Sequence, residues 1–143
     1  MSILDFNNMI DGTGKLVSLE SKKNIPFEIK RVFYIFGTNE QSKRGSHAHY
    51  NTKQYLISIS GSCEICLDNG NGEKKNYKLD SPNKGLFQDA MVWGNMFNFS
   101  SDNVLLVLAN THFSEKDYIR DYEQFLEIQK IQTNKIKIFN IYN

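Results

Sequence analysis

The chain has 143 residues, 40% of them hydrophobic, which is enough apolar material for one buried core and too little chain for two ordinary domains. Its 17 Lys and Arg residues against 16 Asp and Glu residues give a formal charge of +1, far from the basic excess of a nucleic-acid-binding domain. No apolar run approaches the roughly 18 residues of a membrane span, and the N-terminal residues lack the layout of a signal peptide. We therefore expect one cytoplasmic domain, residues 1–143, that binds neither nucleic acid nor a membrane.

Short extended segments broken by turns occupy most of the chain, which predicts an all-β barrel or sandwich. In residues 26–37, alternate positions on both faces carry apolar or aromatic side chains, so we expect this strand to lie between two layers. Residues 103–110 are apolar without alternation, as in a strand that is covered on both sides. The other strand candidates are residues 16–21, 53–61, 62–70, 75–80 and 85–93.

The pattern changes after residue 113. Ser114 and Asp117 resemble a capping box, and aromatic residues then recur at helical spacing. This predicts a C-terminal helix from about residue 115 to about residue 131, following a barrel of about residues 5–113. Residues 132–143 return to β-like alternation and are expected to form a short tail.

Cys63 and Cys66 have the C-x-x-C spacing of a redox pair or of half a zinc site. They lie in a β-like run, and residues three apart in a strand point to opposite faces of the sheet. Thiols on opposite faces cannot share a metal, and the sequence has no second C-x-x-C. We interpret both cysteines as small buried hydrophobic residues.

His47 and His49 are separated by one residue, so both imidazoles would project from one face of a strand into the barrel. With Gln54 and Gly61 they form H-x-H-x4-Q-x6-G, which resembles the first cupin motif, where two histidines and a glutamate bind a metal. Gln54 replaces that glutamate, and Met96 stands where a third histidine would fall. Neutral ligands alone bind divalent metals weakly, so we expect no metal and no other cofactor. The histidines are then free to move protons, unless they are core residues satisfied by hydrogen bonds.

Five segments of the chain form a set with a characteristic order and spacing: IPFEIKRVFYIF, RGSHAH, GLFQDAMVW, NFSSDNVLLVLA and KDYIRDYEQF. Together they resemble the sugar 3,4-ketoisomerases over about residues 5–130. The resemblance implies a metal-independent cupin, or jelly-roll barrel, that forms a homodimer. It also implies conversion of dTDP-4-keto-6-deoxyglucose to a 3-keto sugar nucleotide, which an aminotransferase uses to make 3-amino-3,6-dideoxy sugars for surface polysaccharide.

The same resemblance implies roles for individual residues. His49 is the candidate catalytic base, His47 is its partner, and Tyr34 is expected close to both. Arg44 suits the diphosphate or the sugar oxygens, because a guanidinium presents a planar set of donors. The other expected substrate-binding residues are Arg31, Gln54, Trp93, Thr13 and Lys15.

The chain departs from the family pattern at several positions. Gly94 stands where relatives have a histidine after a Val-Trp pair, and Ala90 stands where they have a proline. Thr13 replaces a bulkier arginine or tyrosine near the sugar. The resemblance is therefore compatible with either the galacto or the gluco configuration at carbon 4 of the product. His112 lies outside the motifs, and we interpret it as a structural or interface residue.

Moving a carbonyl from carbon 4 to carbon 3 requires removing the proton at carbon 3, stabilising an enediolate and returning a proton to carbon 4. His49 can move that proton, while His47, Tyr34 or a water relays protons between the oxygens. Arg44 can stabilise the developing oxyanion. The alternatives are a nucleotide-sugar epimerase, a non-catalytic sugar-nucleotide-binding cupin and a metal-dependent cupin.

Overall fold

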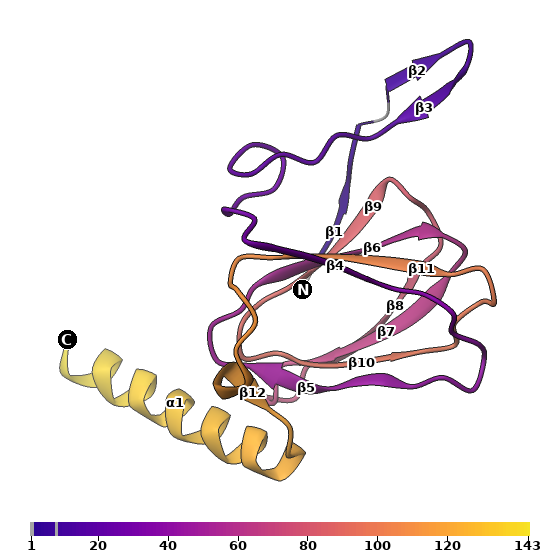
Figure 1. Cartoon of the computed structure of the whole chain (residues 1–143). Coiled ribbons are helices and arrows are strands. Elements are labelled where there is room, and N and C mark those ends of the chain that lie inside the picture. The colour runs from indigo at the N-terminus through magenta and orange to yellow at the C-terminus, as the bar shows by residue number, and fades with distance from the viewer. Residues whose placement is uncertain (1, 8) are drawn as a thin grey trace.

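Two antiparallel β-sheets face one another and form most of the molecule (Figure 1). The computed structural model describes residues 2–7 and 9–143. In spatial order, the first sheet contains β1 (Ser2–Asp5), β9 (Lys84–Gln88), β6 (Gln54–Ser60), β11 (Val104–Ala109) and β4 (Arg31–Ile35). The second sheet contains β12 (Tyr118–Ile119), β5 (Arg44–His49), β10 (Trp93–Phe97), β7 (Cys63–Asp68) and β8 (Lys74–Leu79). The remaining elements are a hairpin of β2 (Met9–Asp11) and β3 (Gly14–Leu16), a 3-10 turn (Glu115–Asp117) and α1 (Tyr122–Tyr142).

This architecture confirms the predicted all-β jelly roll with a C-terminal helix. Its main core lies between the sheets, where Leu56, Ile65 and Leu67 are fully buried. Burying a side chain of this size stabilises the fold by roughly 1.5–3 kcal/mol. Among the described residues, no helix combines the length and the apolar character that crossing a membrane requires.

The two faces of β11 are both covered, as the unbroken apolar run predicts. Leu105 and Val107 point into the core between the sheets. Leu108, on the opposite face, packs in a second cluster with Ile25 and Ile57. The chain between β3 and β4 therefore forms an extra layer over this sheet.

The expectation that β4 is covered on both faces is wrong for the single chain. Phe33 and Ile35 pack against the core, whereas Val32, Tyr34 and Phe36 are 57%, 62% and 68% exposed. The physical reason is the position of β4 as the last strand of its sheet, where no layer of the same chain lies over the outer face. An apolar strip is left open along this edge.

Cys63 and Cys66 are free and buried, as expected for small hydrophobic residues. Cys63 lies in the core between the sheets, and burial raises the pKa of its thiol.

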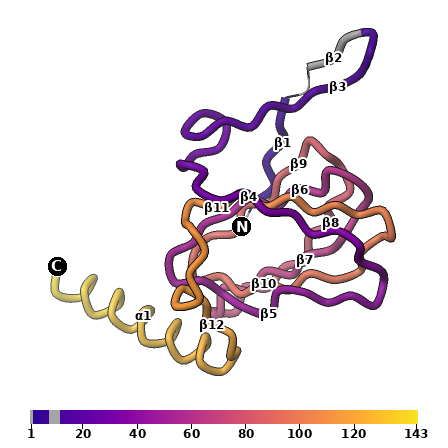
Figure 2. The backbone as a smooth tube through the Cα atoms, in the orientation of Figure 1, coloured from indigo at the N-terminus to yellow at the C-terminus, as the bar shows by residue number. Residues whose placement is uncertain are grey.

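The C-terminal helix begins later and ends later than the sequence pattern predicts. Residues 118–119 pair with β5 in an extended conformation, so the helix cannot begin at residue 115. Asp121, not Ser114, caps it, by accepting a hydrogen bond of 2.9 Å from the backbone N–H of Gln124. Residues 132–142 continue the helix and form no strand, because no sheet edge lies beside them (Figure 2).

Candidate active site

A cavity of about 330 Å³ lies between the two sheets and is lined by residues of β4 and β5 among others. These two strands face one another across the barrel in Figure 1. Side chains from both sheets converge on the cavity, together with the short strand β12. The lining residues are Phe33, Ile35, Lys43, Arg44, Gly45, His47, His49, Gln54, Met96, Tyr118 and Arg120.

An irregularity at the start of β5 sets the direction of its histidines. Gly45 has a φ of +84°, and the pairing register with β10 shifts at this point. A Cβ at Gly45 would lie 2.7 Å from the carbonyl oxygen of Gly94, so only glycine fits here. After this bulge, regular alternation directs His47 and His49 into the cavity and Ala48 to the opposite face, against α1.

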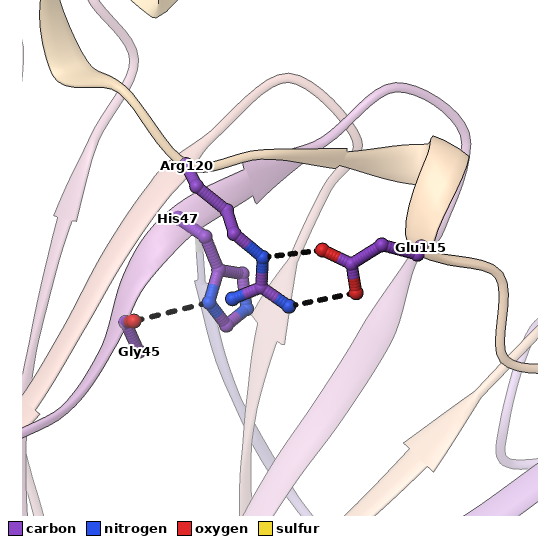
Figure 3. A network of polar contacts seen from close by, with 4 residues as sticks. All are labelled: Gly45, His47, Glu115 and Arg120. Atoms are coloured by element: carbon purple, nitrogen blue, oxygen red, sulfur yellow. Dashed lines mark hydrogen bonds and ion pairs between the residues drawn. The ribbon is translucent and has the colours of Figure 1, made fainter.

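The imidazole of His47 is held by its own strand. Its Nδ1 lies 3.1 Å from the carbonyl oxygen of Gly45 (Figure 3). Because a carbonyl oxygen only accepts hydrogen bonds, the neutral ring carries its proton on Nδ1. The lone pair of the ring is then on Nε2.

Tyr118 packs against both histidines. Its ring centroid lies 4.9 Å from that of His47 and 4.5 Å from that of His49, and the two imidazoles are 4.9 Å apart. The backbone places it there, since Tyr118 pairs directly with His49 across β12 and β5. These three rings form one aromatic wall of the cavity.

Asp117 fastens β12 to the turn between β5 and β6. Its carboxylate accepts hydrogen bonds from the backbone N–H of Asn51 at 2.8 Å and of Thr52 at 3.3 Å. The Thr52 hydroxyl donates a further hydrogen bond to it. Asp117 thus holds the following residue, Tyr118, in register with the histidines.

Both imidazoles are neutral at neutral pH. Burial, aided by the nearby His47, lowers the pKa of His49 to about 4, against a smaller opposing effect of Asp117. Burial also lowers the pKa of His47, although its bond to Gly45 acts in the opposite direction. Neutral imidazoles can accept protons, so the pair is suited to general base chemistry.

The mouth of the cavity is positively charged. Three cationic side chains line it, Lys43, Arg44 and Arg120, and no acidic side chain does. Arg120 lies over the Tyr118 ring at 4.3 Å and is bound to Glu115 through two contacts of 2.7 and 3.1 Å (Figure 3). Such a mouth suits the anionic part of a ligand.

A pair of buried amides lies at the inner end of the cavity. Gln54 donates a hydrogen bond of 2.8 Å to Gln88, which in turn donates one of 3.0 Å to the carbonyl oxygen of Val92. Gln54 lines the cavity, and Gln88 lies behind it at 3% exposure.

Comparisons with known proteins show which family has this fold. The model of the FdtA family, described as WxcM-like, C-terminal, matches residues 1–130. A TDP-4-oxo-6-deoxy-alpha-D-glucose-3,4-oxoisomerase from Aneurinibacillus thermoaerophilus is 46% identical over 134 residues, which cover 93% of this chain and 96% of the relative. The chain belongs to this family of sugar 3,4-ketoisomerases.

Two solved ketoisomerases show the same fold. One, from Helicobacter canadensis, is 46% identical with a TM-score of 0.87, over 90% of this chain and 96% of that chain. The other is QdtA from Thermoanaerobacterium thermosaccharolyticum, solved as a histidine-to-asparagine variant in complex with TDP-4-keto-6-deoxyglucose. It is 38% identical with a TM-score of 0.87, over 90% of this chain and 93% of that chain. The predicted family and fold are therefore confirmed.

The cavity contains four of the residues expected in the active site: His47, His49, Arg44 and Gln54. Tyr34 is not among them. It lies on the outer face of β4, 62% exposed, where its ring packs at 5.9 Å from Phe36. Its neighbour Phe33 points into the cavity instead.

Trp93 also lies away from the cavity. It is buried in the cluster beneath α1, with ring centroids 5.2 Å from Tyr122 and 5.6 Å from Phe125. Since strand residues alternate, Gly94 and Met96 face the interior of the barrel and Trp93 faces the helix. The expectation that Trp93 binds substrate is therefore wrong, because its side chain is part of this buried cluster.

Thr13 and Lys15 belong to the hairpin region, at the far end of the molecule from β5 and β12 (Figure 1). Both are exposed, and neither lines the cavity of its own chain. Arg31 also stays outside the lining, with its guanidinium over the rings of Phe33 and Phe113. Its charge is near enough to contribute to the lowered pKa of His49.

Of the three noted departures, Ala90 lies between Gln88 and Val92, which are joined by a hydrogen bond, and Gly94 lies close to the Gln88 amide. The third, Thr13, lies in the hairpin region described above. His112 is exposed and lies outside the active-site cavity. Its interpretation as a structural or interface residue stays a prediction.

Sequence reasoning missed Tyr118, Arg120 and Gln88. The first two stand in the segment DYIR, which carried the family resemblance but was assigned to the helix. Gln88 shows no pattern of its own, because one polar residue inside a strand is usually solvent-exposed.

In the described part of the chain, no group of three or more His, Cys, Asp or Glu side chains is arranged to hold a metal ion. The cavity offers two imidazoles, the Gln54 amide and the Met96 thioether, and no carboxylate. Metals of the cupin type favour an anionic ligand. This set of donors does not fit a metal centre of the cupin type.

Proposed function

We propose that the chain converts dTDP-4-keto-6-deoxyglucose to a dTDP-3-keto-6-deoxyhexose by proton transfer at two neutral histidines. The observation that carries this proposal is the hydrogen bond from His47 to Gly45, which leaves the Nε2 lone pair free in a cavity with a cationic mouth. A diphosphate is the anionic part that such a mouth would bind.

The reaction balances without a redox partner. A base removes the proton from carbon 3, and the electron pair of that bond forms a carbon–carbon double bond as oxygen 4 becomes an enediolate oxygen. The hydroxyl proton of oxygen 3 moves to oxygen 4. Carbon 4 then takes up a proton, and oxygen 3 becomes the new carbonyl oxygen.

The geometry supports His47 as the base at carbon 3, in place of His49. His47 is partly exposed to the cavity, and its proton is fixed on Nδ1. His49 is only 3% exposed, and its Nε2 is buried without a protein partner. This position suits His49 to the relay between the two sugar oxygens, where a substrate hydroxyl would supply the missing partner.

A homodimer forms part of the proposal. A second copy seated on the strip of Val32, Tyr34 and Phe36 would remove this exposed apolar surface from water. The expected contact of Thr13 and Lys15 with substrate requires that the hairpin region moves or reaches the cavity of a second copy. Cytoplasmic location and a role in surface polysaccharide synthesis stay predictions.

The direct test is incubation with dTDP-4-keto-6-deoxyglucose followed by NMR of the sugar ring. We expect the carbonyl signal to move from carbon 4 to carbon 3, and the coupling constants of the proton at carbon 4 will show whether the product is galacto or gluco. A product that keeps its carbonyl at carbon 4 would instead indicate epimerisation, and an unchanged sugar would indicate a binding protein.

A further inference from the structure

The amide pair behind the cavity has a direction that the protein backbone fixes. The carbonyl oxygen of Val92 can only accept a hydrogen bond, so the Gln88 atom 3.0 Å away must be its NH₂ group. The amide oxygen of Gln88 therefore faces Gln54, and the Gln54 atom 2.8 Å from it must also be an NH₂ group. This leaves the amide oxygen of Gln54 as the end of the chain of hydrogen bonds.

The free end of this chain belongs to the cavity. Gln54 lines the cavity together with His49. Some buried side-chain polar atoms of the described residues lack a hydrogen-bond partner, and the amide oxygen of Gln54 is not one of them, so it is not sealed inside the protein as an unpaired acceptor. The oxygen is an acceptor in a site whose other charged and polar side chains are the two histidines, Tyr118 and the cations at the mouth. A hydroxyl group of a ligand is the donor that fits it.

Gly94 provides the space for this arrangement. A Cβ at this position would lie 2.7 Å from the amide nitrogen of Gln88, closer than real Cβ contacts come. Gly94 is not among the residues with positive φ, so its backbone conformation does not require glycine. The contact with Gln88 accounts for the glycine, and a larger residue would push the end of a flexible side chain without blocking the fold.

We infer that Gln88 is a positioning residue, which holds the amide of Gln54 with its oxygen toward the cavity to accept a hydrogen bond from a sugar hydroxyl, and that Gly94 leaves the room for it. This inference rests on the proposed function for the identity of the ligand. Gln88 acts through Gln54, and it does not touch the substrate.

A double-mutant cycle tests this directly. Gln88→Met keeps the volume and removes both hydrogen bonds, so the Gln54 amide can rotate; Gln54→Met removes the acceptor itself. We expect each variant to lower kcat/KM roughly tenfold and the double variant to lose no more than either one alone. If the two losses of kcat/KM multiply to roughly a hundredfold in the double variant, the inference is overturned. Such a result would mean that Gln88 acts independently of Gln54, as a merely structural residue does.

Gln129→Met is the matched control. Gln129 is another buried glutamine, and it donates hydrogen bonds of 2.9 and 2.6 Å to the carbonyl oxygens of Asn69 and Met91, beneath α1 and outside the cavity. We expect it to lower the melting temperature, as Gln88→Met does, while its effect on kcat/KM stays below twofold and is the same with or without Gln54→Met. A coupling of Gln129 to Gln54 as strong as that of Gln88 would contradict a specific role for Gln88.

Gly94→Ala gives an independent variant. We expect roughly the same tenfold loss as for Gln88→Met, and no further loss when Gly94→Ala is added to Gln88→Met, since the displaced amide is then absent. An unchanged kcat/KM in Gly94→Ala would count against the role of the glycine.

Failure of the function and failure of this inference give different results. If the wild-type protein does not turn over dTDP-4-keto-6-deoxyglucose, the proposed function fails. In that case the affinity of each variant for this sugar nucleotide, measured by calorimetry, replaces kcat/KM in the same double-mutant cycle. Non-additive losses of affinity would still support the positioning of Gln54 by Gln88. Additive losses, or no losses, would overturn it.

Discussion

The Nδ1 atom of His47 lies 3.1 Å from the carbonyl oxygen of Gly45, two residues earlier in the same strand. The left-handed backbone at Gly45 and the tight approach of Gly94 direct this carbonyl toward the ring. A local irregularity of β5 therefore decides which nitrogen of His47 is available as a base.

Gly45→Ala should lower both stability and turnover. The new methyl group would meet the carbonyl oxygen of Gly94 at 2.7 Å, and an L-residue would be strained at a φ of +84°. We expect a loss of about 1–3 kcal/mol in the free energy of unfolding, measured by denaturant titration, and a fall in kcat as His47 loses its acceptor. Gly72→Ala is the control, because Gly72 has a φ of +94° with open space around it and lies outside the cavity lining. Equal loss of kcat in both variants would show that Gly45 has no special relation to His47.

The pH profile of kcat/KM should report the lowered pKa values of the two cavity histidines. Burial lowers the pKa of both His47 and His49 below the ordinary value of 6.5, so each remains a neutral base when the pH falls through that value. We expect the acid limb of the profile, measured on the free enzyme, to have its midpoint below pH 6.5. A midpoint at or above 6.5 would contradict neutral buried imidazoles.

Stability should also depend on the protonation of His49. Its pKa is about 4 in the folded protein and ordinary in the unfolded chain, so between about pH 6.5 and pH 4 only the unfolded chain takes up the proton. Stability therefore falls as the pH is lowered through this window, and a pKa difference of that size corresponds to roughly 3 kcal/mol. His49→Asn should reduce this dependence in denaturant titrations at several pH values, whereas His112→Asn, at an exposed position, should retain it. If the free energy of unfolding depends on pH in the same way in the wild type and in His49→Asn, then His49 is not the source of this dependence.

Arg120 and Glu115 offer a paired test of the cationic mouth. Arg120→Gln removes a positive charge that lines the cavity, and we expect KM to rise roughly tenfold with little change in kcat. Glu115→Gln removes the acid that binds Arg120 and should leave KM unchanged or lower it, since the guanidinium is then free for the diphosphate. If KM rises equally in both variants, substrate binding depends on the Arg120–Glu115 ion pair and not on the free positive charge of Arg120.

The alternation of strand residues made a large part of the site predictable. His47, His49 and Gln54 lie in strands whose two-residue period fixes a shared interior, and the cavity contains all three. The same rule could not decide which face of β4 points inward, because both faces of this strand are apolar. The family resemblance placed Tyr34 beside the histidines, and this was wrong for the single chain, since Phe33 faces the cavity and Tyr34 lies on the exposed outer face of this edge strand.

Tyr118 could not be found in this way. Its place beside His49 depends on a pairing between distant parts of the chain, and the helical spacing of nearby aromatic residues pointed to a helix instead. The start of α1 follows from the same pairing, since the chain must leave β12 before it can turn into a helix at Asp121. Local pattern predicts the kind of element here, and tertiary contacts decide where it begins.

The most direct test of the central claim uses dTDP-4-keto-6-deoxyglucose that carries deuterium at carbon 3, with exchange into water followed by NMR. The account predicts that the wild-type protein removes the label during turnover, and that His47→Asn removes it roughly 10²–10⁴-fold more slowly while its melting curve stays cooperative. Near-normal removal of the label by His47→Asn would contradict the account.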